Sequence, residues 1–172
     1  MSRDRLPVEA YRDSRRSYKR QRDLESWNMI WFDASLSEPA GDEALQRGIA
    51  VMLGVAKDGV NVVHSIEEID ASAVTCVVES STTDAHAYAQ LITIYLPEAF
   101  PSQAILESAS RLATALDRSM LLVNDATANP YSFVHVSHAG QHSVVLVDPD
   151  ELDGKGRYVI RETATEAGII ST

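Results

Sequence analysis

The chain has 172 residues, which fits a single domain and is long enough to bury a core. Its 45% hydrophobic and 23% charged residues are typical of a soluble globular protein, and they exclude a collagen, a coiled coil and a globally disordered chain. The formal charge of −10, from 15 basic and 25 acidic side chains, argues against a surface built for nucleic acid.

The charge is divided unevenly along the chain. Residues 1–23 hold eight basic and four acidic side chains, a net charge of +4, so the other 149 residues hold seven and 21, a net charge of −14. Pro7 at a first helical position and Glu9 in the first turn suit a charged helix over about residues 8–25. Few residues of this segment are apolar, so we expect residues 1–26 to be an extension that is mobile or held against the acidic body by charge.

A strand with apolar side chains on both faces is predicted next, over residues 27–36. Ile30, Phe32 and Ala34 fall on one face, and Trp27, Met29 and Trp31 fall on the other. Such a strand is central in its sheet, or one of its faces meets a partner.

An amphipathic helix is predicted over about residues 43–57, with Asp42 as its cap and Asp58-Gly59 as its end. Gly48 lies beside the apolar stripe of this helix. Because no glycine-rich spacing surrounds it, we interpret it as a close-packing point and not as a phosphate loop.

The middle of the chain alternates short strands with one clear helix. Strands are predicted at 60–63, 72–80 and 87–96, and the polar residues 80–84 favour an antiparallel hairpin between the last two. A helix follows over residues 102–117, with Ile105, Ala109, Leu112 and Leu116 as its buried stripe.

The last third is predicted as four short strands, at 120–124, 131–138, 142–148 and 157–161, before a tail at 164–172 that frays. Strands and helices do not alternate regularly. We therefore expect an α+β fold over residues 27–163, with two amphipathic helices on a largely antiparallel or mixed sheet.

Three of the five histidines, His135, His138 and His142, lie within eight residues. A two-residue loop at Gly140-Gln141 would pair Val136 with Val145 and separate His138 from His142. A three-residue loop over 139–141 would put these two histidines opposite each other, close enough to share an ion. No Cys, Asp or Glu completes the set at a familiar spacing, so we expect no metal.

The acidic residues 148–154 resemble a calcium loop only at first sight. Counted from Asp148, position 5 is Leu152, the glycine falls at position 7, and position 12 is Val159, so the ligand pattern fails. Pro149 and Gly154 favour a turn that carries a negative patch.

Nucleophile elbows, phosphate loops, dinucleotide fingerprints and zinc-protease motifs are missing from the sequence. The one cysteine, Cys76, lies within an apolar strand, where a thiol is usually inert packing. A single cysteine forms no internal disulfide, and the charged N-terminus is unlike a secretory signal, so we expect a cytoplasmic protein. No apolar run approaches the ~18 residues that span a bilayer, and no cofactor is implied.

An acidic α+β domain without catalytic motifs is expected to be a binding protein for a basic partner. Its composition is similar to that of small bacterial immunity proteins, which neutralise toxin enzymes. The residues expected to bind the partner are two aromatic anchors and four acids: Trp27, Trp31, Asp148, Asp150, Glu151 and Asp153.

Two alternatives stay open. One is an enzyme that uses His135 or His138 with Asp125 or Asp148 as an acid–base set. The other is a structural domain that associates with a second copy through Trp27, Met29 and Trp31. Nucleic acid is expected only through the basic N-terminal segment.

Overall fold

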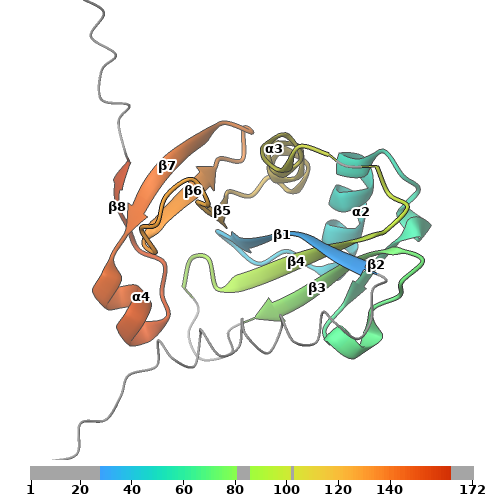
Figure 1. Ribbon diagram of the computed structural model, residues 1–172, viewed down its shortest axis with the longest axis horizontal. Helices are drawn as coiled ribbons and strands as arrows, with labels where there is room; N and C mark the ends of the chain where they lie inside the picture. Colours follow the sequence, from blue (N-terminus) through green and yellow to red (C-terminus); the bar gives the residue numbers. More distant parts are fainter. Residues whose placement is uncertain (1–27, 81–85, 102, 164–172) are drawn as a thin grey trace, which may run out of the picture.

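The computed structural model describes residues 28–80, 86–101 and 103–163. Within these ranges eight strands form one mixed sheet in the order β2-β3-β4-β1-β5-β6-β7-β8, and three α-helices accompany it (Figure 1). The predicted α+β class is confirmed. The predicted extension over 1–26 and the predicted tail over 164–172 lie outside the described residues.

The element bounds follow the labels of Figure 1. The strands are β1 (Asn28–Leu36), β2 (Val60–Val63), β3 (Val74–Ser80), β4 (Gln90–Pro97), β5 (Met120–Val123), β6 (Ser132–Val136), β7 (His142–Val147) and β8 (Ile160–Thr163). The helices are α2 (Asp42–Leu53), α3 (Ile105–Leu116) and α4 (Pro149–Lys155), with 3-10 turns η1 (Lys57–Gly59) and η2 (Ile66–Glu68).

Two crossovers explain why α2 and α3 share one face of the sheet. β1 and β4 are antiparallel neighbours, β3 is antiparallel to β4, and β2 is parallel to β3, so β1-α2-β2 is a parallel crossover toward one edge. The unit β4-α3-β5 is a parallel crossover in the other direction, since β4 and β5 both run antiparallel to β1. Parallel crossovers of this kind are right-handed. The strands of the second unit run opposite to those of the first, and the second unit also crosses the sheet toward the opposite edge. Because these two reversals cancel, both helices lie on the same side of the sheet (Figure 1).

The main hydrophobic cluster fills the space between this face and the two helices. It contains Ile49 of α2, Leu112 of α3 and alternate residues of the strands, among them Phe32, Cys76 and Ile94. Gly48 lies where the helices meet: a Cβ atom there would be 2.8 Å from Cδ2 of Leu116. The predicted close-packing role of Gly48 is confirmed.

The predicted ends of α2 are wrong. Gly41 is the residue before the helix and provides no side-chain cap, while Asp42 is already helical and bonds His64. The helix ends at Leu53, because Gly54 adopts the left-handed conformation (φ 66°) and its N–H bonds the carbonyls of Ala50 and Val51. The Asp58-Gly59 pair lies within η1 instead.

The predicted buried stripe of α3 is right for Ala109 and Leu112 and wrong for Ile105. Ile105 is 42% exposed, whereas Leu112 is 0% exposed. The helix begins at Ile105 and not at residue 102, and its first turn presents Ser108 to the core instead.

A second cluster lies on the opposite face, at the β5–β8 end of the sheet. Leu121, Phe133, Val145 and Val147 form it, and Leu152 of α4 packs against it. The predicted turn over 148–154 is wrong, because Asp148 caps α4 and accepts bonds from the N–H groups of Asp150 and Glu151, with Pro149 in the first turn. The partly buried Leu152 gives this short helix its apolar contact.

Candidate binding surface

The β6–β7 hairpin decides where the three neighbouring histidines lie. Val136 pairs with His142 and Val134 with Val144, so both predicted registers are wrong. The loop is His138–Gly140, closed by bonds from Gly140 N–H to the Ser137 carbonyl (2.8 Å) and from Ser137 N–H to the Gln141 carbonyl (2.7 Å). Gly140 has φ 81°, the left-handed position that completes a three-residue hairpin loop.

This register does not assemble the predicted acid–base set. His138 lies in the loop, while His135 pairs with Ser143 and is half-buried, and burial lowers its pKa. Asp125 is exposed, and the Asp148 carboxylate is bound to Arg161. Across the described residues, no group of three His, Cys, Asp or Glu side chains could hold a metal ion. Cys76 is buried, and burial raises the pKa of its thiol to about 12.

Of the two predicted aromatic anchors, the structure describes Trp31, while Trp27 lies outside the described residues. Trp31 lies where the β1–β4 register shifts between Ile30 and Phe32. Its ring meets that of Phe32 edge-on, with centroids 4.8 Å apart, and it packs half-buried against the main cluster. Much of the Trp31 surface is therefore used inside the protein.

The predicted acidic patch is engaged in local structure at three of its four residues. Arg161 binds Asp148 (2.6 Å), Lys155 binds Glu151 (2.7 Å), and the Tyr131 hydroxyl donates to Asp153 (2.6 Å). Burial would raise the pKa of Asp148, but its bonds from the N–H groups of Glu151 and Asp150 and from Arg161 prevail and lower it. Asp150 is exposed, and it forms no ion pair with another residue that the structure describes.

A more strongly acidic surface lies at the other end of the sheet. We call it the acidic edge, and it comprises the start of α2 with η1 and η2: Asp42, Glu43, Arg47, Lys57, Asp58, His64, Glu67 and Glu68. All eight side chains are exposed, and five acids against two bases leave a net charge of −3 with His64 neutral. Residues 148–161, with four acids and three bases, have a net charge of only −1.

Ion pairs and hydrogen bonds connect the side chains of the acidic edge. Glu43 contacts Lys57 (3.2 Å) and Arg47 (3.9 Å), and the hydrogen bond from Lys57 is the main cause of a lowered Glu43 pKa. The Asp42 carboxylate lies 3.0 Å from Nε2 of His64 and raises the pKa of that imidazole. Both bases are thus occupied by Glu43, and Glu68 adds to the raised pKa of His64. Asp58 and Glu67 form no ion pair with another described residue.

Cations elsewhere in the folded body are used in the same way. Seven Lys and Arg side chains follow residue 27, and six of them lie within 4 Å of an acidic oxygen. The seventh, Arg157, also has a partner. A molecule that approaches the described surface therefore meets unpaired acids and no unpaired cation among these residues.

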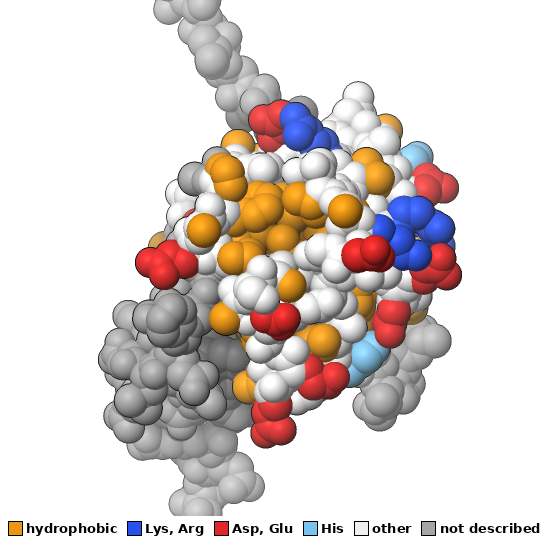
Figure 2. Space-filling view, turned by 90° about the vertical axis from the view of Figure 1, so that its right-hand side faces the viewer, with side chains coloured by type: hydrophobic (Ala, Val, Ile, Leu, Met, Phe, Trp, Pro, Cys, Tyr) orange, Lys and Arg blue, Asp and Glu red, His pale blue; other side chains and the backbone are white. Residues whose placement is uncertain are grey.

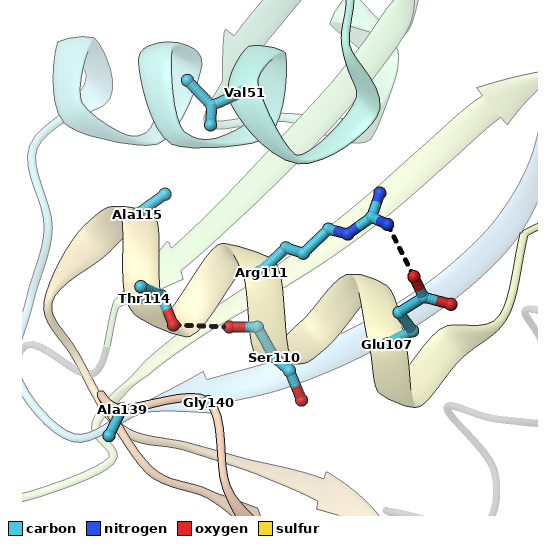
Figure 3. Close-up of a pocket in the computed structure, with 8 residues that line it drawn as sticks. All are labelled: Val51, Glu107, Ser110, Arg111, Thr114, Ala115, Ala139 and Gly140. Atoms are coloured by element: carbon cyan, nitrogen blue, oxygen red, sulfur yellow. Dashed lines mark hydrogen bonds and ion pairs between the residues drawn. The ribbon is translucent and has the colours of Figure 1, made fainter.

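A shallow groove of about 490 Å³ lies between α2, α3 and the β6–β7 loop (Figure 3). Arg111 binds Glu107 (2.5 Å), and the Thr114 hydroxyl donates to the carbonyl of Ser110 (3.0 Å), so these polar groups are satisfied within the groove. Val51 reaches the groove from α2 and is 66% exposed. No Cys or His is among the described residues that line it, and Val51, Ala115 and Ala139 give it apolar surface.

One row of side chains joins the groove to the acidic edge. Glu43, Arg47 and Val51 follow one another at four-residue intervals along α2, and all three are exposed. Figure 2 faces the side of the molecule that carries α2 and β2. It shows hydrophobic side chains gathered in the middle of this face and acidic side chains toward its margin.

Comparisons of the chain with family models, curated proteins and solved structures give no match. None of the described helices has the length and apolar character to cross a bilayer. The surface must therefore be interpreted from its own chemistry.

The groove and the acidic edge were missed in the sequence, although both left traces there. Gly140 was assigned to a hairpin loop, but its approach to Ser110 and Thr114 of α3 depends on tertiary packing. The acids Glu67 and Glu68 are adjacent in the sequence, whereas their proximity to Asp42 requires α2 to pack beside β2. Residues 148–154 are denser in acids, but three of the four acids there form local contacts at α4.

Proposed function

We propose that the protein is a binding protein that recognises a basic protein partner, in the manner of an immunity-type inhibitor that covers a basic toxin enzyme. The observation that carries the proposal is the α2 row that joins exposed Val51 and its groove to the acidic edge. Protein interfaces commonly place apolar anchors at the centre and charges around them. An unpaired acidic margin beside an apolar groove supports a partner with an apolar side chain surrounded by Lys and Arg.

Charge and apolar contact should act on different rate constants. Surface charges at the rim of an interface steer the encounter, so they set the association rate and its dependence on salt. A desolvated apolar anchor acts mainly on the dissociation rate. This separation allows the two parts of the surface to be tested independently.

The experiment starts with capture of a stoichiometric basic protein from an extract of the native cells, followed by measurement of its binding kinetics. The triple variant Asp58→Asn, Glu67→Gln, Glu68→Gln should slow association several-fold at 0.1 M salt, where the Debye length is about 10 Å, and have little effect at 1 M, where it is about 3 Å. Val51→Ser should speed dissociation and leave association nearly unchanged.

A matched control carries the same change in net charge elsewhere. Glu98→Gln, Asp117→Asn, Asp125→Asn removes three exposed acids that lie outside the acidic edge and form no ion pair with another described residue. Equal slowing by both triple variants would show that only the total charge matters. An association rate indifferent to salt and to both variants would refute the proposal.

A further inference from the structure

Exposed side chains form one ridge on α2 and another on α3. The ridge on α2 begins at Glu43 and ends at Val51, with one residue from each turn. On α3 the residues at the same four-residue spacing are Glu107, Arg111 and Ala115, and all three are exposed. Figure 3 shows Val51 reaching the groove from α2, while Arg111 and Ala115 lie on the side of α3. The groove is therefore bounded by two helical ridges.

Small side chains make up the rest of the groove lining. Apart from Val51 and the Glu107–Arg111 pair, the residues that line it are Ser110, Thr114, Ala115, Ala139 and Gly140. The axes of packed helices lie about 8–10 Å apart, and the side chains at the contact set that distance. A lining of small side chains thus leaves room for a further helix to pack closely on this surface.

The hydrogen bonding of the groove decides between a helical and an extended occupant. Each residue of an extended segment brings an N–H and a C=O group that need partners where they are buried. The groove has already used its own groups, because α2 and α3 bond their backbones internally, Arg111 binds Glu107, and Thr114 donates to the Ser110 carbonyl. A helix satisfies its own backbone groups and needs only apolar contact from a groove.

The charges of this surface set the polarity of the occupant. The acidic edge begins at Glu43, which is eight residues from Val51 and ~12 Å away along the helix axis. Asp58 and Glu67 lie in this edge and form no ion pair with another described residue. Cations two turns away from an apolar anchor would therefore meet the acidic edge. Because cations stabilise the C-terminal end of a helix, that end is placed over the start of α2.

We propose that the recognition element of the basic partner is an amphipathic helix that packs between the two ridges, antiparallel to α2. Its apolar side chain contacts Val51, and its Lys or Arg side chains lie two turns later, over the acidic edge. This inference rests on the proposed function and adds the secondary structure and the residue spacing of the partner.

The test uses two labelled, alanine-based peptides of 18 residues, each with one leucine and three lysines. In the facing peptide the lysines stand seven, eight and eleven residues after the leucine, on the same side of a helix. In the off-face peptide they stand five, six and nine residues after it, on the opposite side. Length, composition and charge are identical. Fluorescence anisotropy at about 0.1 M salt should show that the facing peptide binds the full chain about fivefold more tightly or better.

Variants of the protein and of the peptide then locate the contact. Val51→Ser should weaken binding of the facing peptide about threefold or more and change binding of the off-face peptide little. The control Val159→Ser, at a residue that is 42% exposed outside the groove, should change neither. A proline in place of one alanine between the leucine and the lysines breaks the helix, and it should lower the affinity of the facing peptide to that of the off-face peptide.

Equal affinity of the facing and off-face peptides would overturn the inference, because charge alone would then recruit the partner. Tight binding of the proline peptide would also overturn it, since an extended segment would then occupy the groove. A facing peptide that fails to bind would do the same. None of these results bears on the basic partner itself, because the salt dependence of its association and the Asp58→Asn, Glu67→Gln, Glu68→Gln variant test the proposed function separately.

Discussion

Leu112 of α3 offers a direct measure of how much the helix layer contributes to stability. Its side chain is 0% exposed and faces α2, where a Cβ on Gly48 would lie 3.3 Å from Leu112 Cδ1. Leu112→Ala removes three buried carbon atoms, worth ~2.4 kcal/mol at about 0.8 kcal/mol each, before any cavity is counted. Because Gly48 has no side chain that could fill the space, we expect a total loss of about 3 kcal/mol or more in the free energy of unfolding.

The matched control is Ile105→Ala on the same helix. Ile105 is 42% exposed, so its truncation should cost about 1 kcal/mol or less. Urea denaturation followed by far-UV circular dichroism should show a lower midpoint for Leu112→Ala with an unchanged slope. For a chain of this size the melting temperature should fall by roughly 6 to 12 °C. Equal losses for the two variants would refute the assignment of the buried face.

Three further predictions concern single sites. Gly140→Ala should lower the free energy of unfolding by about 1 to 2 kcal/mol, because φ is 81° and the new Cβ would lie 3.1 Å from Thr114 Oγ1. The control Gly59→Ala, whose new Cβ would have nothing within 4 Å, should be nearly neutral in thermal unfolding. Similar melting temperatures for the two variants would count against the loop geometry. The pKa of His64, followed by NMR, should lie above its usual value of about 6.5 and fall in Asp42→Asn. The stability that this contact adds should be complete below about pH 6.5 and disappear as the pH rises through the raised pKa. An identical titration of His64 in both proteins would contradict the contact. Cys76 should resist alkylation at pH 8 in the native protein and react rapidly in urea, and rapid reaction without urea would show that the thiol is accessible.

Local pattern was sufficient for the fold class and for most strands. The β3–β4 hairpin is antiparallel as predicted, because period-two apolar patterns flank a polar connection. Helix ends were less predictable: Gly54 and Asp58-Gly59 both suit a helix end, and only the conformation of Gly54 decides between them. The hairpin register depended on where the positive-φ residue stands in the loop. Gly140 is the last residue of the observed three-residue loop and not the first residue of a two-residue loop.

The candidate surface was harder to derive because it depends on pairing between distant residues. Asp148 in the sequence is one acid among four, and nothing local indicates that Arg161 will bind it. Conversely, Asp42 and His64 are separated by an entire helix and a strand, yet they meet because β1-α2-β2 returns the chain to the same edge. Charge counted along the sequence therefore overstates the patch at α4 and hides the acidic edge.

The central position of β1 also dictates when the sheet can close during synthesis. Leu36 pairs with Met120, which is 84 residues later in the chain. At about 5 to 20 residues per second, the ribosome needs roughly 4 to 17 s to supply that partner. The β3–β4 hairpin is complete earlier and presents β4 as a template for β1, but the other side of β1 waits for β5. We therefore expect nascent chains that end before residue 120 to expose an unpaired apolar strand edge, which is the state in which a chaperone would bind them and in which they would aggregate.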